Sequence, residues 1–146
     1  MAAGEPMKVV NLAEERQHRS SRDESARAPS PLAGLSVLVV EDEAVVAEAA
    51  IMMLEDAGAQ PIGPCASVSA ALAALETHQI DLALLDVDLK GMRSNAVAQA
   101  LSERGIPYVA ATGHTIAAAM AGAPVIVNKP YAPAQLQAAL ESAIAR

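Results

Sequence analysis

Short apolar stretches alternate with amphipathic stretches from residue 35 to the end of the chain. The apolar stretches are rich in Val, Ile, Leu and Ala, as in strands that are buried on both faces. The amphipathic stretches place apolar residues three or four positions apart, which is the period of a helix. We therefore expect five strands, each followed by a helix. The expected strands lie at residues 36–40, 61–62, 81–85, 108–111 and 125–127.

Turn and cap residues bound the expected helices. Four of them begin near Val45, Ser67, Met92 and Pro133, and a short alanine-rich helix lies between the fourth and fifth strands. Strict alternation of strand and helix predicts a parallel sheet with helices on both faces, and right-handed crossovers leave few topologies. The sequence therefore predicts a doubly wound α/β fold, with a five-stranded parallel sheet in the flavodoxin-like order 2-1-3-4-5 and five helices.

The composition of the chain changes near residue 33. The first 33 residues carry five acidic and five basic side chains and close on Ala28-Pro-Ser-Pro31, a linker-like run. The whole formal net charge of -7 therefore lies in the remainder. We expect residues 1–33 to form a mostly mobile N-terminal extension with room for a short helix, and residues 34–146 to form one folded domain.

Charge and composition exclude several classes of function. An acidic chain with two Tyr and no Phe or Trp lacks the basic patch and the stacking surfaces that nucleic-acid binding needs. The single Cys65 has no partner for a disulfide or a zinc site. No signal-peptide core precedes residue 20, and prolines and glycines interrupt the uncharged stretch 105–128. We expect a cytoplasmic protein that binds neither nucleic acid nor a membrane.

Acidic residues gather at the carboxyl ends of two predicted strands, where functional groups of parallel sheets lie. Glu41, Asp42 and Glu43 follow the first strand, and Asp86 and Asp88 follow the third. Neighbouring carboxylates at the edge of an apolar core repel each other, and a divalent cation would hold them ionised. A cluster of oxygen ligands suits Mg²⁺. Glu43 also has a simpler explanation, since an acid is favourable at the start of a helix.

Two further strand ends carry groups of complementary chemistry. Thr112 follows the fourth strand and Lys129 follows the fifth. A hydroxyl and an ammonium that face a carboxylate and a metal form a phosphoryl-transfer site. Taken singly, Thr112 fits a helix cap, Lys129 a surface lysine and Asp86 a solvated turn residue. Their joint placement at the strand ends favours the site.

In this order the residues resemble the receiver domain of bacterial two-component response regulators, over Leu35–Arg146. The resemblance implies that Asp86 is the phosphoacceptor and that Mg²⁺ binds at Glu41, Asp42, Asp86 and the backbone carbonyl of Asp88. It implies equally that Thr112 is the switch hydroxyl, that Lys129 is the lysine characteristic of the family, and that the Lys129–Pro130 bond is cis.

The segment Pro107–His114 resembles the FAT GUY subgroup, whose fourth strand ends in Phe-Ala-Thr-Gly, although Ala110 stands here in place of the Phe. This resemblance implies a stand-alone receiver that works with histidine kinases of the HWE type or a related type. It also implies a mobile loop and helix after Gly113. The family usually has an aromatic residue three positions before Lys129, where this chain has Ile126.

The resemblance implies a signalling protein rather than an enzyme. Asp86 would accept a phosphoryl group from a histidine kinase or phosphotransfer protein, and the signal would leave by contact with an unknown downstream protein. One alternative is an aspartate-nucleophile phosphatase, because Asp86 and Asp88 have the spacing of its acid pair. The other is a non-phosphorylated pseudo-receiver that acts as an interaction module. The sequence does not identify the kinase, the target, the oligomeric state or the role of residues 1–33, nor does it distinguish an output role from a phosphate sink.

Overall fold

The computed structural model describes residues 30–89, 91–113 and 125–145. The described residues from Pro31 onward belong to one compact unit. Within it Leu32 is fully buried, two positions before the predicted start of the folded domain. The predicted N-terminal extension up to residue 29, the predicted fourth helix and the loop after Gly113 lie outside the described residues.

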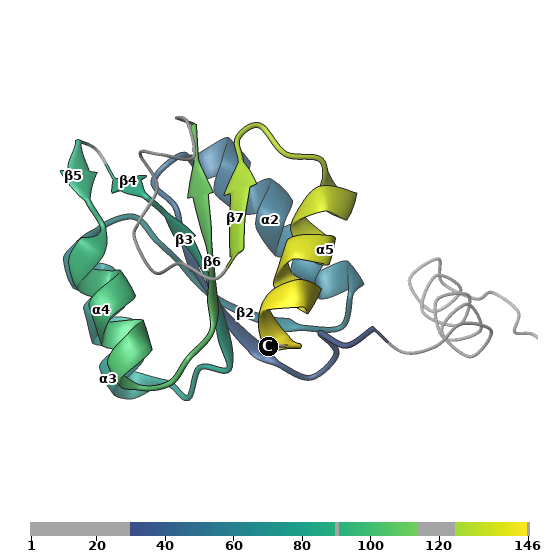
Figure 1. Ribbon diagram of the computed structural model, residues 1–146, viewed down its shortest axis with the longest axis horizontal. Helices are drawn as coiled ribbons and strands as arrows, with labels where there is room; N and C mark the ends of the chain where they lie inside the picture. The colour runs from purple at the N-terminus through teal and green to yellow at the C-terminus, as the bar shows by residue number, and fades with distance from the viewer. Residues whose placement is uncertain (1–29, 90, 114–124, 146) are drawn as a thin grey trace, which may run out of the picture. The chain divides into compact units, whose positions relative to one another are not determined.

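Five parallel strands form the central sheet, in the spatial order β2-β1-β3-β6-β7 (Figure 1). Numbered along the chain among themselves, these strands follow the predicted order 2-1-3-4-5. Their bounds are Ser36–Val40 for β1, Gln60–Cys65 for β2, Leu82–Asp86 for β3, Tyr108–Thr112 for β6 and Val125–Asn128 for β7. The prediction of a doubly wound parallel sheet is confirmed.

Helices cover both faces of this sheet (Figure 1). Helices α2 and α5 lie on one face, and α3 and α4 lie on the other. Their bounds are Ala44–Asp56 for α2, Val68–Thr77 for α3, Asn95–Glu103 for α4 and Pro133–Ile144 for α5. Four of the five predicted helices are thus seen. The remaining one, the predicted fourth helix along the chain, falls in residues 114–124. Of the helices in the described part of the chain, none has the length and hydrophobicity needed to cross a bilayer.

Alternate residues of the inner strands belong to two hydrophobic clusters, one on each face of the sheet. Leu38 and Leu85 join the cluster on the α3 and α4 side. Val37 and Leu84 join the cluster on the α2 and α5 side, which also holds Leu32. All five residues of β3 are buried, as expected for a strand covered on both faces. The sheet is thereby fixed as a rigid frame for the loops at its carboxyl edge.

The third predicted helix starts later than its apolar pattern indicated. Residues 92–93 form β5 (Met92–Arg93), which pairs antiparallel with β4 (Asp88–Leu89). Gly91 has a φ of 81° in the turn between them, a conformation that glycine adopts without steric cost. Helix α4 therefore begins only at Asn95.

Strand β2 is longer than the predicted two-residue strand and lies outermost among the described strands. It contains Pro61 and Pro64, and a register shift interrupts its pairing with β1. Gly63 has a φ of 112°, and a Cβ there would lie 2.8 Å from the carbonyl oxygen of Val39. The Lys129–Pro130 bond is cis, as the resemblance implied, and Gly63–Pro64 is cis as well.

Candidate functional site

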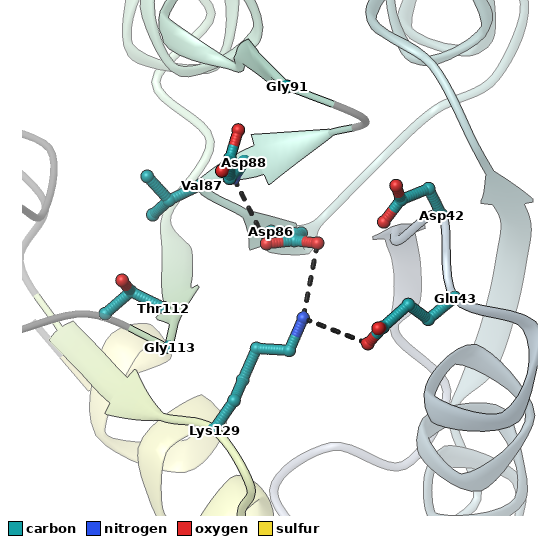
Figure 2. Close-up of a pocket in the computed structure, with 9 residues that line it drawn as sticks. All are labelled: Asp42, Glu43, Asp86, Val87, Asp88, Gly91, Thr112, Gly113 and Lys129. Carbon is teal, nitrogen blue, oxygen red and sulfur yellow. Dashed lines mark hydrogen bonds and ion pairs between the residues drawn. The ribbon is translucent and has the colours of Figure 1, made fainter.

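The carboxyl ends of four neighbouring strands bring the predicted site residues together. In the sheet register Val40 lies beside Leu85, Asp86 beside Ala111 and Thr112 beside Asn128. The residues that follow β1, β3, β6 and β7 therefore meet at one edge. They line a pocket together with two glycines and Val87, and the lining residues are Asp42, Glu43, Asp86, Val87, Asp88, Gly91, Thr112, Gly113 and Lys129 (Figure 2).

Asp86 lies between the other functional groups of this pocket. Figure 2 shows Asp42 and Thr112 on opposite sides of Asp86, with Lys129 reaching toward it from β7. The Asp86 side chain is buried, and its Oδ1 accepts a hydrogen bond of 3.2 Å from the backbone N–H of Asp88. Thr112 is also buried, at the end of β6. A carboxylate and a hydroxyl thus share one pocket with an ammonium group.

Lys129 is held among carboxylates rather than on the surface. Its Nζ lies 3.3 Å from Glu41 Oε1, 3.3 Å from Asp86 Oδ2 and 3.6 Å from Glu43 Oε1. Its backbone N–H donates to the carbonyl of Thr112 at 2.8 Å, which fixes the start of the loop after β7. Burial alone would lower the pKa of Lys129, but the charges of Asp86 and Glu41 outweigh burial and raise it. The ammonium group therefore stays charged.

Two acids of this edge, Glu41 and Asp86, are desolvated. Burial and, to a lesser extent, the charge of Asp86 raise the pKa of Glu41 to about 7, against hydrogen bonds from Glu43 N–H and Lys129 that lower it. Burial also raises the pKa of Asp86. A hydrogen bond of 3.1 Å from the N–H of Glu43 orients the Glu41 carboxylate. The two buried acids, Glu41 and Asp86, therefore share the one ammonium of Lys129. When both acids are ionised, this single positive charge does not neutralise their two negative charges.

The donor set fits a hard divalent cation. Glu41, Asp42 and Asp86 each offer a carboxylate oxygen, and these three atoms lie within 4.8 Å of one another. Oxygen ligands of this kind suit Mg²⁺, and the charge of the ion would offset the repulsion between desolvated carboxylates. Glu43 lies at the N-cap position of α2 without a side-chain cap bond, and its carboxylate faces Lys129 instead. The helix-dipole explanation alone does not account for that orientation.

The family model of the response regulator receiver domain matches residues 37–141, the greater part of the chain. The chain belongs to the response regulator receiver family. Comparison with curated proteins gives no match. Receiver domains are signalling modules of two-component systems, which agrees with the predicted family.

Solved structures support the same family and fold. The chain is 34% identical to SdrG from Sphingomonas melonis Fr1, covering 77% of this chain and 98% of SdrG with a TM-score of 0.69. A putative response regulator from Chloroflexus aurantiacus J-10-fl is 25% identical, over 77% of this chain and 99% of that one, with a TM-score of 0.70. The PhyR receiver domain from Erythrobacter litoralis is 18% identical over 77% and 91%, with a TM-score of 0.68, and shows likeness of fold alone.

The receiver domain contains two site features that the sequence analysis did not single out. Ser94 is fully buried, and its Oγ donates to the backbone carbonyl of Asp86 at 2.6 Å. A Ser-Asn pair before the apolar positions of α4 was a usable cap signal, and it would have moved the predicted helix start to residue 95. Tyr131 has a buried hydroxyl without a hydrogen-bond partner among the described residues, and burial raises its pKa to about 12.

Proposed function

We propose that this receiver accepts a phosphoryl group on Asp86 from a histidine kinase or phosphotransfer protein and passes the signal on by protein contact. The observation that carries the proposal is the setting of the Asp86 carboxylate. It is buried at the carboxyl edge of the sheet, 3.3 Å from the Lys129 ammonium and in one pocket with Thr112. An acid, a cation and a hydroxyl that line one pocket are the groups that phosphoryl transfer to a carboxylate needs.

The chemistry is an in-line displacement at phosphorus. A carboxylate oxygen of Asp86 attacks the phosphorus of a phosphohistidine, the N–P bond breaks, and its electron pair returns to the imidazole nitrogen of the donor. The product is an acyl phosphate on Asp86. The Lys129 ammonium, already beside Oδ2, would bind a phosphoryl oxygen, and the Thr112 hydroxyl would bind another.

Mg²⁺ belongs to this proposal as the cofactor. Glu41, Asp42 and Asp86 would hold the ion, Glu41 through water, and the backbone carbonyl of Asp88 would complete the set. An ion bound there supplies positive charge that offsets the charge on the phosphoryl oxygens. Burial raises the pKa of Asp86, and the neighbouring Lys129 ammonium opposes that shift by favouring the ionised carboxylate.

The same residues support a finer proposal about the subgroup. We propose a stand-alone receiver of the FAT GUY subgroup, made of residues 34–146 behind an N-terminal extension, acting in the cytoplasm with a kinase of the HWE type. The Ala-Thr-Gly run at 111–113, at the end of β6, supports the subgroup. A PhyR stress response regulator is 21% identical, over 93% of this chain and 54% of that one, with a TM-score of 0.69, and shares the fold alone.

Substitution of the phosphoacceptor tests the proposal. The protein is incubated with acetyl phosphate and Mg²⁺, and intact mass is measured. The wild type should gain one phosphoryl group, and Asp86→Asn should gain none. Asp81→Asn is the matched control, because it makes the same change just before β3, where the side chain is exposed and does not line the pocket, and it should still allow modification. Phosphorylation of Asp86→Asn would contradict the assignment, and steady release of phosphate from small phosphoesters would favour the aspartate-nucleophile phosphatase instead.

A further inference from the structure

Ser94 occupies the N-cap position of α4 without acting as a helix cap. A serine in this place usually accepts a hydrogen bond from a backbone N–H of the first helical turn. The Ser94 side chain makes no such bond, and the residue is fully buried. Its Oγ lies 2.6 Å from the carbonyl oxygen of Asp86 and 3.1 Å from that of Val87. The hydroxyl is thus turned toward the end of β3.

The bonds around Ser94 fix the peptide that follows Asp86. A hydroxyl has one proton, and the 2.6 Å contact assigns it to the Asp86 carbonyl. The Val87 carbonyl accepts the backbone N–H of Ser94 at 3.0 Å, and the Val87 N–H donates to Ala111 at 2.9 Å. Both ends of the peptide unit are therefore held, one by β6 and the other by Ser94.

This anchoring also reaches the backbone of Asp88, the next residue along the chain. The Val87 N–H donates to Ala111 on β6 and the Val87 carbonyl accepts the N–H of Ser94, so Val87 joins the base of the hairpin to the sheet. Asp88 follows directly in β4, and its N–H donates to Asp86 Oδ1 at 3.2 Å. The position of the Asp88 backbone relative to the Asp86 carboxylate therefore depends on how the hairpin base is held.

We propose that Ser94 is a positioning residue for phosphoryl transfer, and the inference rests on the proposed role of Asp86. Its hydroxyl holds the base of the β4–β5 hairpin, and with it the position of the Asp88 backbone, whose carbonyl is the proposed Mg²⁺ ligand, relative to the Asp86 carboxylate. Without the hydroxyl, the Asp86 carbonyl loses its donor and the hairpin base can rotate. The folded sheet does not depend on this bond, but the alignment of the two oxygen ligands does.

The test compares Ser94→Ala with Ser67→Ala. Ser67 is the matched control because it is an N-cap that does cap its helix, accepting the N–H of Ala70 at 3.1 Å. Three quantities are measured: the Mg²⁺ dissociation constant by NMR titration, the rate of phosphorylation by acetyl phosphate at saturating Mg²⁺, and the melting temperature. Ser94→Ala should weaken Mg²⁺ binding and slow phosphorylation by about tenfold each. Ser67→Ala should lower the melting temperature alone.

A second variant and a metal-free measurement complete the test. Ser94→Cys fills nearly the same space with a weaker donor and should give intermediate values. In the metal-free protein, the Asp88 amide signal should shift in both Ser94 variants and stay in place in Ser67→Ala. Wild-type Mg²⁺ affinity and rate in Ser94→Ala would overturn the positioning role. Phosphorylation of Asp86→Asn would instead overturn the proposed function, so the two failures are distinguishable.

Discussion

The two ends of β3 carry the same residue type in opposite surroundings. Asp81 comes just before the strand and is exposed, and its Oδ2 accepts the backbone N–H of Ser36 at 2.8 Å. Asp86 ends the strand five positions later and is buried among Glu41 and Lys129. The first acid ties two strands together at the amino edge, and the second lies in the pocket. Chemistry in this receiver comes from the surroundings of an aspartate rather than from its presence.

The difference extends to the whole carboxyl edge. Among the described residues, the buried polar side chains are Glu41, Asp86, Ser94 and Thr112, and each of them follows or ends a strand there. Burial of polar groups costs free energy unless partners compensate. In the described part of the chain that cost is concentrated at the carboxyl edge, which is where the proposed phosphoryl group and Mg²⁺ would bind.

The largest effect should come from Asp42→Asn, which removes one carboxylate from the acid cluster. Loss of a direct ligand charge should weaken Mg²⁺ binding by about a hundredfold, more than the loss of a positioning group. Isothermal titration with Mg²⁺ measures the change. An affinity within threefold of the wild type would show that Asp42 is not a ligand. The acids at the carboxyl edge would then not differ in Mg²⁺ binding from Asp81 at the amino edge.

An effect of similar size should appear in the pH dependence of stability. The pKa of Glu41 is raised from 4.5 to about 7 in the folded protein. Between these values the folded state keeps a proton that the unfolded state releases, so metal-free stability should fall by roughly 3 kcal/mol as pH rises from about 4.5 to 7. The raised pKa of Asp86 acts in the same direction.

Urea unfolding in EDTA, from pH 5 to pH 8, measures this dependence. Glu41→Gln is the control, because it keeps the shape of the side chain and removes the titration, and its stability should vary less over the same range. Saturating Mg²⁺ should reduce the loss of stability toward high pH, since the cation favours the ionised acids. Stability of the metal-free wild type that rises with pH would contradict the desolvation of this edge.

The smallest effect is expected at the amino edge. Asp81→Asn keeps an oxygen acceptor for the N–H of Ser36 in an exposed place, so the free energy of unfolding should change by less than about 1 kcal/mol. Mg²⁺ affinity should stay within about twofold of the wild type, because exposed charges at this distance are screened. A tenfold change in affinity would mean that the two ends of β3 are coupled through the sheet.

Sequence patterns predicted the sheet because its strands have strong local signals. The predicted strand 81–85 and the polar residues after each strand were enough to place Asp86, Thr112 and Lys129 at one edge. Strand β2 was underestimated, because Pro and Gly disfavour strands locally while pairing with β1 overrides that preference. The start of α4 was predicted too early, because the spacing of apolar residues does not reveal the hairpin at Gly91 that precedes the helix.

The pattern of apolar and polar residues did not predict the direction of the Ser94 side chain. A serine before a helix predicts a cap, and only the path of the chain between β3 and α4 turns the Ser94 hydroxyl back to Asp86. The burial of the acidic side chains was likewise not predicted from the sequence. The sequence predicted that Glu41 and Asp42 lie near Asp86, but burial, which decides their protonation, depends on how the loops close over the sheet.

Strand β2 bears on how this protein behaves at high concentration. An outermost strand with free N–H groups is a template on which a second chain can add, and such addition leads to aggregation. Pro61 and Pro64 remove the N–H donor from two of the six positions of β2. A strand from a second chain could therefore form only some of the backbone hydrogen bonds of a regular sheet with β2. The chain can therefore keep an open-edged sheet at low risk of forming fibrils along that side.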